Sequence, residues 1–139
     1  MDDKLSRVIP TMRYRDAHAA IDWLCRVFGF ERHLVVDDDK GGVAHAQLTL
    51  GGGMLMLGSA REGDVWSRHM ASPSAEGIGT QSVCIVIADV DAAHARAIEA
   101  GATIIDPLSD RDYGGRGFGC VDPQGHSWWA GSYDPWVEA

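Results

Sequence analysis

The amino-acid sequence predicts an α+β fold built from two tandem βαβββ modules. Two observations carry this prediction: the order of helical and extended patterns, and the recurrence of that order along the chain. The helix caps Asp16 and Asp89 lie 73 residues apart, and the glycines after the two helices, Gly29 and Gly101, lie 72 apart. The segment GGGMLMLGS (51–59) aligns with QGHSWWAGS (124–132) at the same offset of 73. A common offset across caps, turns and strands indicates a duplicated module.

Two segments have the pattern of amphipathic helices. The first begins at the N-cap residue Asp16 and ends at Gly29, and the second begins at Asp89 and ends at Gly101. Apolar residues recur at intervals of three and four within both, at positions 20, 21, 24, 27 and 28 and at positions 90, 93, 97 and 100. Each helix should therefore bury one stripe against a sheet.

The remaining patterned segments predict eight strands. Those of the first module are 7–15, 30–36, 42–50 and 53–59, and those of the second are 81–88, 102–108, 115–121 and 127–133. We predict one domain over 1–139, with module 1 at 5–61 and module 2 at 79–134. The Ser/Ala/Gly-rich stretch 71–80 is the predicted linker.

Composition excludes several classes of function. The net charge is −8, from 12 basic and 20 acidic residues with no basic cluster, so neither nucleic acid nor an anionic membrane is an expected partner. No stretch has the length and apolarity of a membrane span, and the N-terminus lacks the apolar run of a signal peptide. The three widely spaced cysteines form neither a disulfide framework nor a zinc motif, which favours a cytoplasmic protein with free thiols.

Three stretches resemble one known family. They are YRDAHAAIDWLCRVFGFE (14–31), IADVDAAHARAIEAGATI (87–104) and CVDPQGHSWW (120–129). Together they resemble the vicinal oxygen chelate superfamily, which includes glyoxalase I, bleomycin-resistance proteins and extradiol dioxygenases, and most of all its bleomycin-resistance-like members. The resemblance implies that the paired modules form a curled eight-stranded mixed sheet around a cleft, and that the chain forms a homodimer.

The resemblance also makes a specific demand on four positions. Enzymes of this family hold a divalent metal with one residue on the first and one on the last strand of each module. Those positions carry Ile9 and Met56 in the first module and Ser82 and Trp129 in the second. Such metals require imidazole, carboxylate or thiolate ligands, which these four residues do not supply. We therefore expect neither a metal nor a cofactor.

Strand alternation predicts which residues face the cleft. Of the adjacent tryptophans, Trp128 should enter the core and Trp129 should face the cleft, because neighbouring strand residues point to opposite sides. Trp66 belongs to a segment, 64–70, for which the family resemblance implies a position over the cleft. The predicted ligand-binding residues are Trp129, Phe118, His45, Gln47, Met56, Ser82, Arg116 and Trp66. The alternatives are that Met56 and Phe118 fill a closed cleft, that His45 is a satisfied buried imidazole, and that Trp66 anchors a loop.

These observations favour a metal-free protein that binds a small organic ligand, an antibiotic or planar natural product, over an enzyme. No residue is assigned a catalytic role. The alternative is a metal-dependent lyase, isomerase or dioxygenase of the same superfamily, with the metal held by other residues. A third hypothesis is metal-free acid–base catalysis by His45.

Overall fold

A computed structural model describes residues 6–74 and 78–137 of the chain. The elements of the first module are β1 (Thr11–Tyr14), α1 (Ala17–Phe28), β2 (Glu31–Asp37), β3 (Val43–Leu50) and β4 (Gly53–Ser59). A short 3₁₀ helix, η1 (Trp66–Arg68), lies between the modules. The elements of the second are β5 (Val83–Val86), α2 (Val90–Glu99), β6 (Thr103–Asp110), β7 (Arg116–Val121) and β8 (Ser127–Gly131). Residue 5 of the predicted module 1 and residues 75–77 of the predicted linker lie outside the described residues.

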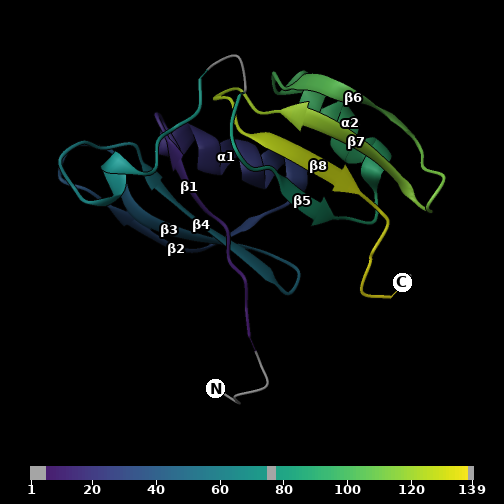
Figure 1. Ribbon diagram of the computed structural model, residues 1–139, viewed down its shortest axis with the longest axis horizontal. Helices are drawn as coiled ribbons and strands as arrows, with labels where there is room; N and C mark the ends of the chain where they lie inside the picture. Colours follow the sequence, from purple (N-terminus) through teal and green to yellow (C-terminus); the bar gives the residue numbers. More distant parts are fainter. Residues whose placement is uncertain (1–5, 75–77, 138–139) are drawn as a thin grey trace.

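The strands form two four-stranded mixed sheets, ordered β1-β4-β3-β2 and β5-β8-β7-β6. In each, the first strand of the module runs parallel to the last, and the other neighbours are antiparallel. Figure 1 shows the two sheets next to each other, with β1 and β5 on their facing sides. The predicted α+β fold of two βαβββ modules is confirmed, although the sheets do not join into a continuous ladder.

The repeat extends to residue pairing. Thr11 lies beside Met56 in the first sheet, and Cys84 lies beside Trp129 in the second. Both partners are shifted by the same 73 residues that separate the two helix caps. The caps form as predicted: Asp16 accepts a hydrogen bond from the amide of Ala19 at 3.1 Å, and Asp89 accepts one from Ala92 at 3.0 Å.

The first strand of each module is shorter than its apolar pattern suggests. The predicted strand 7–15 forms a ladder only over β1, Thr11–Tyr14, and 81–88 forms one only over β5, Val83–Val86. Proline has no amide hydrogen, so Pro10 cannot donate to the ladder, although its carbonyl accepts from Met56 at 2.9 Å.

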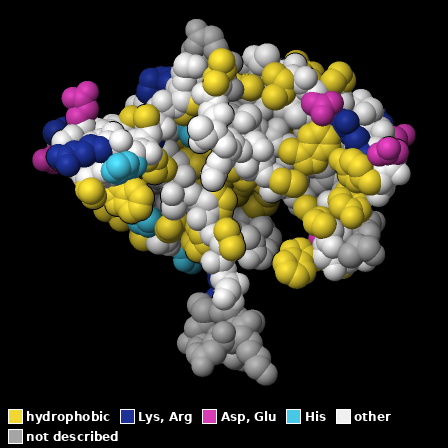
Figure 2. Space-filling model, in the orientation of Figure 1, with side chains coloured by type: hydrophobic (Ala, Val, Ile, Leu, Met, Phe, Trp, Pro, Cys, Tyr) yellow, Lys and Arg dark blue, Asp and Glu magenta, His cyan; other side chains and the backbone are white. Residues whose placement is uncertain are grey.

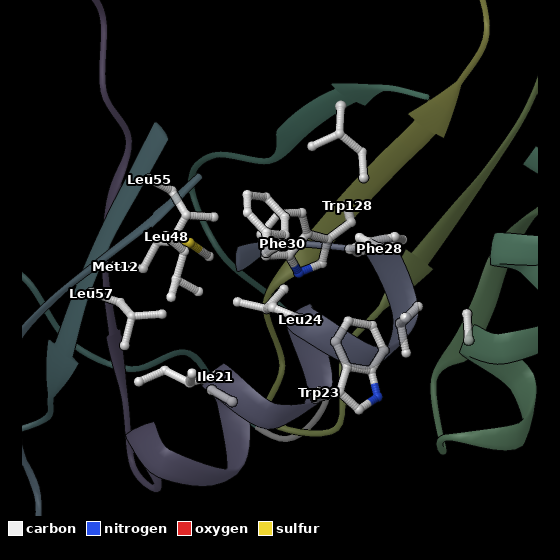
Figure 3. Packing of buried hydrophobic residues seen from close by; sticks show 14 of the residues in the cluster. Met12, Ile21, Trp23, Leu24, Phe28, Phe30, Leu48, Leu55, Leu57 and Trp128 are labelled. Carbon is white, nitrogen blue, oxygen red and sulfur yellow. The ribbon is translucent and has the colours of Figure 1, made fainter. Parts of the chain in front are cut away.

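One hydrophobic core joins the two modules (Figure 3). Trp128 of β8 is 1% exposed, which confirms its predicted burial. Its ring lies 5.4 Å from the ring of Phe28, at the end of α1, and 6.2 Å from that of Phe30. Residues of the second module therefore pack directly on the helix of the first.

A buried carboxylate ties the same region together. Asp122 Oδ2 accepts hydrogen bonds from the hydroxyl of Tyr14 at 2.6 Å and from Nε1 of Trp128 at 3.0 Å. Asp122 Oδ1 accepts from the amides of Gln124 and His126. Burial, followed by the nearby Asp122 charge, raises the pKa of Tyr14 well above its usual value. The end of β1 is thus fixed against the turn that precedes β8.

Within the described ranges, no helix has the length and apolarity needed to cross a lipid bilayer. The longest, α1, has 12 residues, against about 20 for a spanning helix.

Candidate functional site

Two pockets adjoin at the β1 edge of the first sheet. The larger has a volume of about 830 Å³ and lies between β1 and β5. The smaller, of about 240 Å³, lies on the face of β1, β3 and β4 opposite the core. Five residues line both pockets: Thr11, Met12, Arg13, Trp66 and Met70. The two volumes therefore form one binding region, which we call the β1 site.

The segment that carries η1 lines part of the β1 site through Trp66 and Met70. Trp66 is the first residue of η1, and 62% of its surface remains exposed. Asp64 fixes the turn before it by accepting from the amide of Ser67 at 2.7 Å, and this bond is the largest cause of the lowered pKa of Asp64. Trp66 therefore lines the site from a well-anchored turn with most of its surface still accessible.

Arg13 is the buried cation of the β1 site. It lies on β1 between the core residues Met12 and Tyr14 and is only 8% exposed. Its Nη2 approaches Asp64 Oδ2 at 3.5 Å, whereas its Nη1 is buried and has no hydrogen-bond partner. An unpartnered buried guanidinium N–H is costly, because its hydration is lost without replacement.

His45 and Met56, both predicted ligand-binding residues, line the smaller pocket. The Nε2 atom of Gln47 lies 3.0 Å from Nε2 of His45, as expected for residues two apart on one strand face. Ser82 lines the larger pocket from the other side, just before β5.

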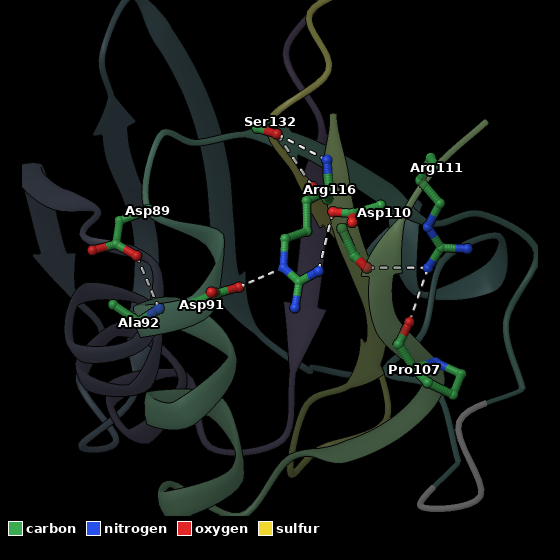
Figure 4. A network of polar contacts seen from close by, with 9 residues as sticks. Asp89, Asp91, Ala92, Pro107, Asp110, Arg111, Arg116 and Ser132 are labelled. Atoms are coloured by element: carbon green, nitrogen blue, oxygen red, sulfur yellow. Dashed lines mark hydrogen bonds and ion pairs between the residues drawn. The ribbon is translucent and has the colours of Figure 1, made fainter. Parts of the chain in front are cut away.

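Trp129, the second of the adjacent tryptophans, points away from the helices but lines neither pocket of the β1 site. Its indole lies along β7: a Cβ built on Gly117 would come within 2.6 Å of indole Cζ2. The guanidinium carbon of Arg111 lies 4.4 Å from the ring centroid. Nη2 of Arg111 is held by the carbonyl of Pro107 at 3.0 Å (Figure 4) and by that of Gly117 at 3.1 Å.

The predicted orientation of β7 was wrong. Trp129 pairs with Gly119, so the odd-numbered residues of β7 share its face and the even-numbered ones face α2. Phe118 is accordingly 0% exposed, with its ring 5.0 Å from that of His94 on α2. Arg116 Nε donates to Asp91 on α2 at 2.7 Å (Figure 4), and its ion pairs with Asp91 and Asp110 raise its pKa.

The sequence is similar to those of known proteins. The family model described as "Glyoxalase/Bleomycin resistance protein/Dioxygenase superfamily" matches residues 6–130. The chain belongs to this superfamily. An uncharacterized protein of Mycobacterium tuberculosis (strain ATCC 25618 / H37Rv) is 31% identical over 119 residues, which cover 86% of this chain and 69% of the relative.

Solved structures of the superfamily agree. TioX from Micromonospora sp. ML1 superposes with a TM-score of 0.68 at 32% identity, covering 91% of this chain and 98% of TioX. The fosfomycin resistance protein FosX from Mesorhizobium loti superposes with a TM-score of 0.65 over 97% of this chain and 95% of its own. At 14% identity, FosX shows a shared fold alone.

The metal of the superfamily's enzymes does not fit the four corresponding residues here. Ile9 and Ser82 line the larger pocket, Met56 lines the smaller, and Trp129 lies between β7 and Arg111. An alkyl group, a hydroxyl, a thioether and an indole do not form a divalent-metal site. In the described part of the chain, no group of three or more His, Cys, Asp or Glu residues is placed to hold a metal.

Strand alternation placed Arg13 on the cleft face, but the predicted ligand-binding set left it out, together with Arg61 and Met70, although all three line the β1 site. The signal for Arg13 was present, since a charged residue stands between two apolar ones in a strand. Arg61 and Met70 follow β4 in an irregular segment, where no periodicity indicates which way a side chain points.

Proposed function

We propose that this protein binds a small planar organic molecule, such as an antibiotic or another natural product, in the β1 site without a metal ion. The observation that carries the proposal is the pair of adjoining pockets beneath Trp66. The larger, at about 830 Å³, falls within the range of typical ligand pockets, roughly 300–1,000 Å³.

The lining of the β1 site suits a flat, mainly apolar ligand. The indole of Trp66 offers a stacking surface worth about 0.5–1.5 kcal/mol beyond the area that it buries. Met12, Met56 and Met70 add thioethers, which adapt to irregular shapes. Polar groups are fewer, as in binding sites where they fix orientation while apolar contact supplies affinity.

Sequestration requires affinity rather than chemistry. A micromolar dissociation constant corresponds to about −8.2 kcal/mol, which a pocket of this size can supply without a reactive group. The family model names bleomycin-resistance proteins, which supports a protective role. The second candidate is a metal-dependent lyase, isomerase or dioxygenase, and its only support is family membership.

Metal analysis and a thermal-shift screen test the proposal together. Purified protein should contain no stoichiometric transition metal, and planar aromatic compounds should raise its melting temperature. Trp66→Ala should weaken the best binder roughly tenfold, since one stacking platform is lost. Trp136→Ala is the matched control, because Trp136 is 93% exposed and lines neither pocket. Stoichiometric metal, or equal effects of the two variants, would overturn the proposal.

We further propose that the protein acts as a cytoplasmic homodimer. Free thiols at positions 25, 84 and 120 suit a reducing compartment. Large apolar residues remain exposed on the second module, including Val86 at 44% and Ile105 at 60%, and a second copy is the proposed cover. Figure 2 shows hydrophobic side chains gathered over the part of the molecule where β5–β8 lie. Light scattering coupled to size exclusion should give twice the 15.0 kDa chain mass, and a monomer would refute this assembly.

A further inference from the structure

Two buried polar atoms of the β1 site have no partner in the protein. They are Nη1 of Arg13 and Oγ of Ser72, and both residues line the larger pocket. Only one other side-chain atom among the described residues, Nε of Arg111, is buried and unpartnered. Native proteins satisfy almost all buried polar groups, so two such atoms in one pocket call for an explanation.

Asp64 does not satisfy Arg13. Its Oδ1 is engaged by the amide of Ser67 at 2.7 Å. Its Oδ2 lies 3.5 Å from Nη2 of Arg13 and 3.7 Å from Nε of Arg61, both long for a charge-assisted hydrogen bond. The two guanidinium groups share one carboxylate, which leaves an excess of positive charge at this end of the site.

The charge of the lining runs against that of the chain. The protein as a whole has 20 acidic and 12 basic residues. Yet among the described residues that line the two pockets, none is Asp or Glu. The ionisable lining residues are Arg13, Arg61, His45, His69 and His126. Such a pocket selects anions, because a nearby cation favours a negative group and partial burial reduces screening.

We propose that the ligand of the β1 site carries an anionic oxygen group, a carboxylate in the first instance, which accepts hydrogen bonds from Nη1 of Arg13 and Oγ of Ser72. This inference rests on the proposed binding function and names the class of its ligand: a planar aromatic acid. The aromatic part stacks beside Trp66 and the methionines, while the acid group satisfies the two donors. Guanidinium groups suit this role, because their N–H donors match the geometry of oxyanions.

Matched probe pairs test this proposal. Benzoate, naphthalene-2-carboxylate and anthracene-2-carboxylate are titrated calorimetrically into the full-length protein, each beside its uncharged carboxamide. We expect the best-bound carboxylate to bind at least tenfold more tightly than its amide. Arg13→Gln should remove roughly tenfold to a hundredfold of the carboxylate affinity and change that of the amide less than twofold. Ser72→Ala should produce a smaller loss in the same direction.

Arg111→Gln is the matched control. It removes an equal charge and an equally unpartnered buried nitrogen, but from the turn that follows β6, outside both pockets. This variant should bind every probe as the parent protein does. Equal weakening by Arg13→Gln and Arg111→Gln would mean that overall charge, not a built site, attracts the anion, and would overturn the proposal.

The stability of the ligand-free protein gives a second readout. Because Nη1 of Arg13 is buried without a partner, Arg13→Met should leave the melting temperature unchanged or raise it, while abolishing the preference for carboxylates. An arginine that only supports the fold gives the opposite result, a lower melting temperature with that preference retained.

The outcomes separate this inference from the function on which it rests. Amides that bind as tightly as carboxylates would refute the anionic ligand and leave the binding function standing. If no probe binds, both the anionic ligand class and the proposed binding of planar aromatic compounds are refuted. Tight binding of inorganic phosphate in place of the aromatic acids would show that the donors serve a free anion, which also refutes the proposed ligand class.

Discussion

Equivalent positions in the two modules carry side chains with different contacts. In the first, Arg13 lies beside Gly58 on the parallel β1–β4 pair, buried at the edge of an open site. In the second, Val86 takes the place of Arg13, beside Gly131 on the β5–β8 pair. The second module instead has Trp129, in the position equivalent to Met56, packed along its own sheet under Arg111.

This difference places both guanidinium groups of the β1 site, those of Arg13 and Arg61, in the first module, although residues of the second module line the other side of the larger pocket. The backbone register is the same in both modules, so the change lies in the side chains at a few positions of the first and last strands. A guanidinium without a full set of partners can receive a ligand. Arg111 also has a buried nitrogen without a partner, Nε, but its guanidinium is stacked on an indole, donates to two carbonyl groups and lines neither pocket.

The two adjacent tryptophans give the largest expected contrast. Trp128→Ala should cost about 3–5 kcal/mol of unfolding free energy, because it empties the core and leaves Asp122 without one of its donors. Trp129→Ala should cost about 1 kcal/mol, mostly the lost contact with Arg111. Urea unfolding measures both. Similar costs would show that the second indole supports the fold as much as the first.

A substitution at Gly117 should displace the indole of Trp129 from β7. The Cβ of Gly117→Ala would lie 2.6 Å from indole Cζ2 and 3.0 Å from the carbonyl oxygen of Ala130, so Trp129 has to move. We expect a loss of about 1–3 kcal/mol and a shift in tryptophan emission. Gly52→Ala is the control, with nothing within 4 Å of its built Cβ. An unchanged spectrum for Gly117→Ala would contradict the position of the indole.

Much of this architecture follows from local sequence signals. Asp16 and Asp89 mark both helix starts, and alternation placed Trp128 in the core and Trp129 on the other face. The error at Phe118 and Arg116 arose because alternation gives two faces but not which of them meets a helix. That choice depends on register across the 122–125 turn, where Gly119 pairs with Trp129. Similarly, how many of the N–H groups of Arg13 find a partner depends on Asp64, 51 residues away in sequence. No local sequence pattern reveals this.

Alkaline pH should weaken the core that joins the modules. Burial, followed by the Asp122 charge, raises the pKa of Cys120 from 9.0 to about 12. The folded thiol stays protonated where the unfolded thiol ionises, so its contribution is complete below pH 9 and is lost as pH rises toward 12. Tyr14, whose pKa is also raised, acts in the same direction. Cys120→Ala should flatten the fall of unfolding free energy between pH 9 and 11, and an unchanged slope would contradict the shift.

The smallest effect concerns the exposed face of the second module. Cys84, beside Trp129, is exposed, whereas Cys120 is buried, so an aromatic disulfide reagent should modify Cys84 first and Cys120 only on unfolding. Cys25 is half-buried and should react at an intermediate rate. Early reaction of Cys120 would indicate that the β7–β8 region opens readily.

The central claim, that the β1 site binds a ligand without a metal, has one direct test. The best-bound aromatic carboxylate is titrated into protein dialysed against EDTA, and then into the same protein supplemented with Mn²⁺, Fe²⁺ or Zn²⁺. We predict the same dissociation constant in every case, with one ligand per chain. Binding that disappears in EDTA and returns with any of these ions would contradict it.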